Sequence, residues 1–138
     1  MNNQEAFDKA CALLKQQNAC SVRGQRCAYA GPDGRACAIG GLLPRELAER
    51  LDKADSSGWQ AIVQVVDEPD WNDADVVAAA TEAKAVLGGC DDDFLDSLQR
   101  AHDFCQDING QDFWKTARTE LTRVASRFGL SLPPELQS

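Results

Sequence analysis

Residues 27–44 read CAYAGPDGRACAIGGLLP, a segment in which two cysteines flank a turn. Pro32 fixes its own φ near the value that a turn needs, and Gly34 accepts positive φ at little cost. We therefore expect the chain to reverse direction here and to fold the first cysteine back towards the second. The segment is predicted to form a two-stranded hairpin, or else a turn followed by a short helix from Ala36.

Along most of the remaining chain, apolar residues recur with the helical period. Pro44 can open one of these helices, because its missing N–H would be unpaired at the first helical position. The predicted helices cover residues 4–17, 44–53, 58–67, 73–87, 92–108 and 111–128. The sequence thus predicts a mainly α fold, a compact single-domain bundle of about six helices with one small hairpin or irregular loop at Cys27–Cys37. The domain is expected to span residues 1–132, followed by a short extended C-terminal tail at 133–138.

The composition is that of an acidic globular protein. The 138 residues fit one domain with its own core, and 43% apolar and 26% charged residues are ordinary for such a domain. The formal net charge of −8 argues against direct binding to nucleic acid, because such binding relies on clustered Lys and Arg. We therefore expect a partner protein with a basic surface.

Neither a signal peptide nor a membrane-spanning segment is recognisable in the sequence. The first residues, MNNQEA, lack a basic region and an apolar run, and no stretch approaches about 18 uninterrupted apolar residues. We expect a cytoplasmic protein without membrane contact. In a reducing compartment the six cysteines are expected to be free thiols or metal ligands rather than disulfides, while the even count leaves disulfides open if the protein is exported by another route.

Acidic residues form a line along the predicted helix 92–108. Such a line is typical of a solvated face, but like charges one turn apart disfavour a helix slightly, so we also consider a docking surface for a basic protein. Trp71 lies two residues after Pro69 in an acidic loop, and it is the best candidate for an exposed contact residue. The candidate partner-binding residues are Trp71, Asp92, Asp96, Asp103 and Asp107.

His102 is the single histidine of the chain, and it lies on or beside the apolar face of the same helix. The simplest interpretation is a core imidazole that is satisfied by neighbouring backbone and side-chain groups. A second interpretation is one structural zinc ion, for which Cys27, Cys37, His102 and Cys105 supply enough ligands. This set lacks the compact Cys-x2-Cys spacing of many zinc sites.

A third interpretation is nucleophilic catalysis by Cys37 with His102 as its base. If a helix begins at Ala36, the helix dipole lowers the pKa of the thiol. Asp103 is next to the histidine in sequence, but its side chain is expected to point about 100° away on a helix. We therefore predict that Asp103 does not orient the imidazole.

Two motifs resemble a pattern in a loose group of short, uncharacterised proteins of bacteriophages and bacterial chromosomes. The first is CxYxGxxGxxCAIGxLxP over residues 27–44, and the second is LQxxHD over residues 98–103. The resemblance implies that Cys27, Cys37, His102 and Asp103 form one constellation and that the gene travels with phages or other mobile elements. It implies no particular reaction.

These observations favour a binding protein over an enzyme. We expect a small acidic cytoplasmic protein of the inhibitor, immunity or regulatory kind, which docks onto a host, defence or toxin protein. The alternative is a thiol-dependent enzyme that uses Cys37 and His102.

Overall fold

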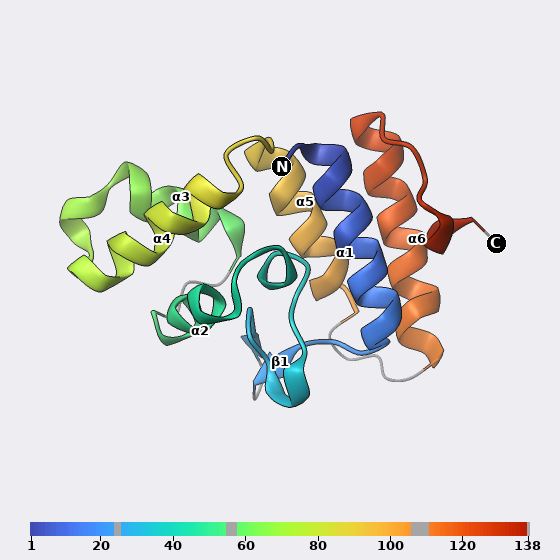
Figure 1. Cartoon of the computed structure of the whole chain (residues 1–138), viewed down its shortest axis with the longest axis horizontal. Coiled ribbons are helices and arrows are strands. Elements are labelled where there is room, and N and C mark those ends of the chain that lie inside the picture. Colours follow the sequence, from blue (N-terminus) through green and yellow to red (C-terminus); the bar gives the residue numbers. More distant parts are fainter. Residues whose placement is uncertain (24–25, 55–57, 106–110, 138) are drawn as a thin grey trace.

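The computed structural model describes residues 1–23, 26–54, 58–105 and 111–137, with only the backbone at 22–23, 26–27 and 111–112. These residues are mainly helical, which confirms the predicted fold class, and Figure 1 shows their arrangement. The α-helices are α1 (Asn3–Gln17), α2 (Arg45–Lys53), α3 (Trp59–Asp67), α4 (Ala74–Val86), α5 (Asp92–Asp103) and α6 (Gln111–Phe128). The shorter elements are strands β1 (Val22–Arg23) and β2 (Arg26–Cys27) and the 3-10 helices η1 (Pro32–Gly34), η2 (Gly40–Leu42), η3 (Pro69–Trp71) and η4 (Pro134–Leu136).

Helix α1 is fixed by its own local sequence. The Asn2 side chain accepts a hydrogen bond from the Glu5 amide at 2.9 Å, and the Glu5 carboxylate accepts one from the Asn2 amide at 3.4 Å. This reciprocal pair is a capping box, which satisfies two amides at the helix start. Asn18 ends the helix in the left-handed conformation, with a φ of 48°. The predicted helix 4–17 is therefore confirmed, with its end at Gln17 as predicted and its start one residue earlier, at Asn3.

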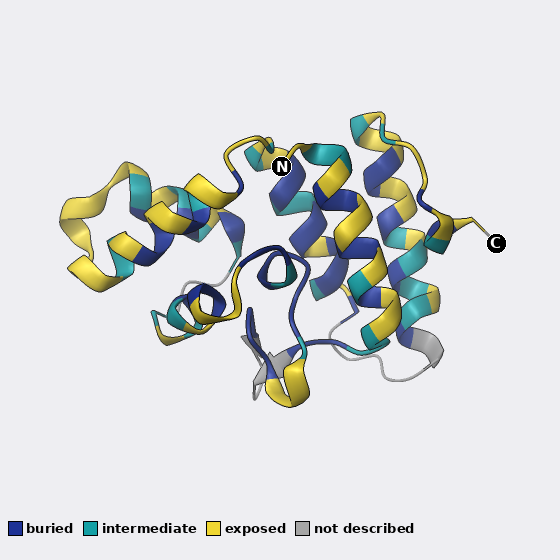
Figure 2. Cartoon of the chain, viewed as in Figure 1, coloured by how far each residue is buried: buried dark blue, intermediate teal, exposed yellow. Residues whose placement is uncertain are grey.

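The helices form two groups. In the first, α6 contacts both α1 and α5, and the three run side by side (Figure 1). In the second, α4 contacts α2 and α3, while α3 also contacts α5 of the first group. The buried faces of both groups meet in one core, whose largest buried side chains include Trp59, Phe7, Phe94 and Phe113 (Figure 2).

The predicted chain reversal is confirmed at residues 31–35. The Gly31 amide donates to the Arg35 carbonyl at 2.8 Å, and the Cys37 amide donates to the Ala28 carbonyl at 3.2 Å. Gly34 has a φ of 75°, as the turn requires. The segment Cys27–Cys37 is irregular apart from η1, and the small antiparallel strand pair β1–β2 leads into it.

Helix α2 holds this loop in place. The Asp52 carboxylate accepts hydrogen bonds from the amides of Tyr29 and Ala30, both at 2.8 Å. At the other end of the helix, the Arg45 guanidinium donates to the carbonyls of Gly31 at 2.7 Å and Arg35 at 2.8 Å. The turn is therefore held by side chains of a neighbouring helix as well as by its own bonds.

Three predicted details differ from the structure. No helix begins at Ala36, because the chain stays irregular until η2. Helix α5 ends at Asp103 rather than at residue 108, and its end tightens as the Cys105 amide bonds to the carbonyl of His102, three residues back, at 3.0 Å. The predicted extended tail contains the turn η4 and buries Leu136, so apolar burial holds it against the domain.

Within the described ranges, no helix is both long and apolar enough to cross a membrane.

Candidate functional site

His102 is fully buried and belongs to a hydrogen-bonded chain of polar groups. The amide of Ser21 donates to His102 Nε2 at 3.1 Å. Because Nε2 accepts this bond, the ring proton lies on Nδ1, which donates to Asp103 Oδ1 at 3.1 Å. The first interpretation from the sequence, a core imidazole with both nitrogens satisfied, describes this arrangement.

The prediction that Asp103 points away from His102 was wrong. Asp103 Oδ1 receives the His102 bond and a second bond from Gln99 Nε2 at 2.9 Å. The helical angle of about 100° places the two Cβ atoms on different sides, but neighbouring Cα atoms are only about 3.8 Å apart, so the two side chains can still meet. Asp103 therefore orients the imidazole.

Gln99 links this chain to the loop that carries Cys37. Its Oε1 accepts a bond from the Ile39 amide at 3.3 Å, and Cys37 Sγ accepts one from the Gly40 amide at 3.2 Å. Side chains of α5 thus connect the segment at Ser21 with the segment at Cys37–Gly40. The structure brings Cys37, His102 and Asp103 into one neighbourhood, while the side chain of Cys27 lies outside the described part of the chain.

The geometry does not activate Cys37 as a nucleophile. The residue is 1% exposed, and burial raises the pKa of its thiol from 9.0 to about 12, although the hydrogen bond from Gly40 lowers it. The predicted lowering of this pKa by a helix dipole was wrong, because no helix begins at Ala36. His102 Nε2 is also already occupied by the Ser21 amide, so it is not free to remove a proton from the thiol.

The zinc interpretation gains no support from the described side chains. Among these, no group of three or more His, Cys, Asp or Glu residues could hold a metal ion. Cys105 Sγ instead donates to the Ala101 carbonyl at 3.5 Å. Cys27, the fourth candidate ligand, is described only in its backbone, and the zinc ion stays a prediction.

The line of aspartates on α5 is engaged with the protein's own residues. Asp92 accepts from Trp59 Nε1 at 2.8 Å, and its other carboxylate oxygen lies 3.4 Å from Lys84 Nζ. Asp96 pairs with Arg100 at 3.0 Å. Asp103 faces His102, and Asp107 lies outside the described residues. Each described member of the line therefore has a partner within the protein, and together they do not form a free acidic face.

Trp71 is the most exposed large hydrophobic side chain of the described residues, with 85% of its surface accessible. It ends η3, the short connection between α3 and α4, at the end of the molecule that projects furthest from α1 and α6 (Figures 1 and 2). The sequence predicted this exposure correctly. Trp71 is thus presented to solvent at a protruding end of the fold.

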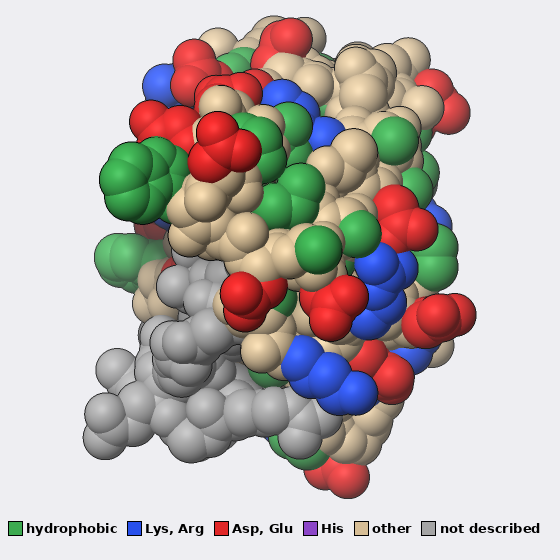
Figure 3. Space-filling view, turned by 90° about the vertical axis from the view of Figure 1, so that its left-hand side faces the viewer, with side chains coloured by type: hydrophobic (Ala, Val, Ile, Leu, Met, Phe, Trp, Pro, Cys, Tyr) green, Lys and Arg blue, Asp and Glu red, His purple; other side chains and the backbone are tan. Residues whose placement is uncertain are grey.

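Five carboxylates surround Trp71 in what we call the acidic tip, residues 67–75. They belong to Asp67, Glu68, Asp70, Asp73 and Asp75, and all five residues are exposed. No Lys or Arg occurs between residues 54 and 83, so nothing in this stretch balances their charge. Figure 3 looks at the molecule from this end and shows acidic side chains next to exposed hydrophobic ones. The sequence analysis noted the acidic loop but placed the docking line on α5.

No family model, curated protein or solved structure matches this chain in our comparisons.

An open groove of about 540 Å³ runs beside Trp71, between α3 and α4. Its lining is mixed: Ala61, Val65 and Val76 contribute apolar side chains, and Gln64, Glu68, Asn72 and Asp73 contribute polar ones. The acidic tip therefore offers an exposed aromatic side chain, a groove of mixed polar and apolar lining, and negative charge. These are the features of a contact site for a protein with basic and apolar side chains.

Proposed function

We propose that this chain is a protein-binding module whose acidic tip docks onto a basic surface of a partner protein. The observation that carries the proposal is the exposed Trp71, which lies among five exposed carboxylates in a stretch without Lys or Arg. Aromatic side chains of this kind are frequent anchors of interfaces, and opposite charges steer the two proteins together. Inhibition, immunity or regulation of a host, defence or toxin protein would all use such a contact.

A capture experiment tests this proposal. The purified chain is immobilised, incubated with a bacterial lysate at low salt, and washed in steps from about 0.05 M to about 1 M salt, over which the Debye length falls about fourfold. A captured partner should elute as the salt concentration rises. The partner is then identified, purified and bound again in a direct titration.

Variants of the tip make the experiment specific. Trp71→Ala and the double variant Asp70→Asn, Asp73→Asn should each weaken the titrated affinity at least about tenfold. Asp93→Asn, which removes an equally exposed charge from α5, is the matched control and should leave the affinity nearly unchanged. Equal binding by wild type and Trp71→Ala would contradict the proposal.

A further inference from the structure

A second surface carries charge opposite to that of the acidic tip. The α5–α6 groove holds about 250 Å³, and the residues that line it include Ser97, Arg100, Phe104, Glu120, Arg123 and Arg127. Three arginines and one glutamate give this lining a positive balance in a protein whose formal net charge is −8. The groove is therefore a basic site on an acidic protein.

The arginines of the groove are accessible to an incoming anion. The side chains of Arg100 and Arg123 are 77% and 73% exposed. Among the described side chains, each pairs with a carboxylate about one turn away on its own helix, Asp96 at 3.0 Å and Glu120 at 3.2 Å, both of them 20% exposed. Exposed pairs of this kind contribute little, about 0.2–1 kcal/mol. Carboxylates of another molecule can therefore replace them.

Phe104 supplies an exposed aromatic ring at the groove. It follows the last residue of α5 and is 66% exposed, second only to Trp71 among the large hydrophobic side chains of the described residues. One of the two most exposed aromatics thus lies among carboxylates and the other among arginines. The two surfaces are complementary in charge, and each carries an apolar anchor.

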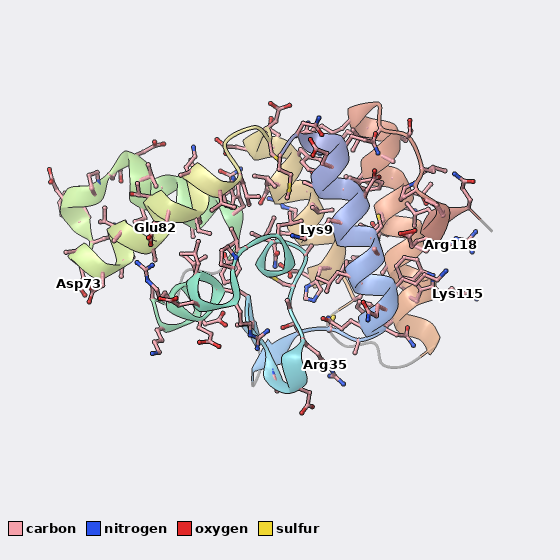
Figure 4. The ribbon with its side chains drawn as sticks, in the orientation of Figure 1. Lys9, Arg35, Asp73, Glu82, Lys115 and Arg118 are labelled. Atoms are coloured by element: carbon pink, nitrogen blue, oxygen red, sulfur yellow. The ribbon has the colours of Figure 1, made fainter. Side chains whose placement is uncertain are left out.

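The two surfaces cannot meet within one molecule. Figure 4 places Asp73 of the tip at one end of the molecule and Lys115 and Arg118, on the same helix α6 as Arg123, at the opposite end. Contacts of α3 with α5, and of α4 with α2, hold the tip at its own end. A tip that reaches the groove must belong to another molecule.

We propose that the α5–α6 groove binds the acidic tip of a second copy of this chain. Trp71 of one copy meets Phe104 of the other, and the tip carboxylates replace Asp96 and Glu120 as partners of the groove arginines. This inference rests on the proposed function, because both use the acidic tip. It adds a self-associated form of the free protein, which competes with the external partner for the tip.

Analytical ultracentrifugation of the purified chain tests the self-association. At low salt the mass should rise from 15.0 kDa with increasing concentration, and about 1 M salt should return it to 15.0 kDa. A mass of 15.0 kDa at every concentration up to roughly 1 mM, the weak limit of specific binding, would overturn the inference.

Charge reversal identifies the two surfaces. The groove variant Arg123→Glu, Arg127→Glu changes the formal charge of the groove lining from +2 to −2, and the tip variant Asp67→Lys, Asp70→Lys, Asp73→Lys changes that of the tip from −5 to +1. Each variant should stay monomeric, because its two surfaces then carry the same sign. An equimolar mixture of the two should associate, since every surface then finds its opposite. A mixture that stays monomeric, although circular dichroism shows both variants folded, would overturn the inference, as would association of the groove variant alone.

The groove variant also separates this inference from the proposed function. It retains the wild-type tip, so it should capture the external partner as well as wild type does or better. If the tip variants lose lysate capture and the groove variant keeps it, this result supports the proposed function and does not test self-association. Loss of self-association in the groove variant, with capture retained, supports only the inference drawn here.

Discussion

At the scale of single residues, the polar chain around His102 acts as a structural connection. Asp103 accepts from His102 Nδ1 and from Gln99 Nε2, and Gln99 in turn binds the Ile39 amide. A buried donor without an acceptor costs about 1–3 kcal/mol, so each link depends on the next. Asp103 is the link on which two donors depend.

Replacing Asp103 should therefore destabilise the fold, and the loss should depend on how many hydrogen bonds the new side chain can accept from His102 and Gln99. We expect Asp103→Ala to lower the free energy of unfolding by about 1–3 kcal/mol, and Asp103→Asn, which keeps one acceptor oxygen, to lower it by less. Urea unfolding at pH 7 measures both. Asp93→Ala, an exposed position on the same helix, is the control and should cost less than about 1 kcal/mol. Equal effects of the Ala variants would contradict this role.

The buried thiols should make the protein sensitive to alkali. Burial raises the pKa of Cys37 from 9.0 to about 12, so above pH 9 the unfolded chain releases a proton that the folded chain keeps. The stabilisation from this group is complete below pH 9 and is lost as the pH rises towards 12, by up to about 1.4 kcal/mol per pH unit. Cys37→Ala should flatten the fall in unfolding free energy between pH 9 and pH 10.5.

The slopes are compared by urea unfolding under reducing conditions. The comparison uses the slope and not the absolute stability, because the smaller alanine side chain also removes packing contacts. Cys11, whose pKa burial likewise raises to about 12, should keep part of the slope in the variant. Identical slopes for wild type and Cys37→Ala would show that this thiol does not contribute.

At the scale of elements, the Cys27–Cys37 loop depends on close backbone approach at Gly40. A Cβ atom added there would lie 2.0 Å from the Tyr29 carbonyl oxygen, a backbone atom that cannot move alone. The same loop is tied to α2 through Asp52 and to α5 through Gln99. A shift at Gly40 therefore disturbs three elements together.

We accordingly expect Gly40→Ala to lower the free energy of unfolding by about 3 kcal/mol or more, at the upper end of overpacking effects. Gly88→Ala is the matched control, because its Cβ would lie at an ordinary distance of 3.4 Å from the nearest atom, the Lys84 carbonyl oxygen. This control should be neutral or slightly stabilising, since alanine restricts the unfolded chain. Thermal unfolding measures the stability of both variants. A large loss for Gly40→Ala with none for Gly88→Ala would show that the close backbone contact at Gly40, and not the added methyl group as such, causes the loss.

The sequence predicts those elements whose determinants are local. Helix α1 carries its own caps and apolar face, and Trp71 lies in a loop whose composition indicates exposure. The hydrogen bonds of the His102 ring and of Asp103 involve Ser21 and Gln99, and helical geometry alone does not reveal these contacts. The strand pair is only two residues long on each side, too short for an alternating pattern.

At the scale of the whole molecule, charge is unevenly distributed. The acidic tip holds five carboxylates in a stretch of sequence without Lys or Arg, whereas Lys115, Arg118, Arg123 and Arg127 lie on α6. Figure 4 shows the labelled residues of these two groups at opposite ends. The sequence predicted the exposed Trp71 but also placed the aspartates of α5 in the partner-binding site. In the structure, the described aspartates of that line pair with side chains of the protein itself.

Ionic quenching of tryptophan fluorescence measures the field at the tip. Trp71 is 85% exposed and Trp59 only 1%, so quenching by small ions should report mainly Trp71, with a smaller share from the half-buried Trp114. The negative surroundings should concentrate caesium and repel iodide at low salt. We expect caesium to quench more than iodide, and Trp71→Phe to remove most of this difference. Stronger quenching by iodide would contradict an acidic tip.

The bracing of the tip has a kinetic consequence. Trp59 Nε1 joins the start of α3 to Asp92, and Arg50 of α2 pairs with Glu82 of α4, so the two helices that carry the tip are fastened near their bases. A preorganised surface of this kind gives up little conformational entropy on association. The carboxylates should then set how fast a partner is encountered, and Trp71 should set how long it stays.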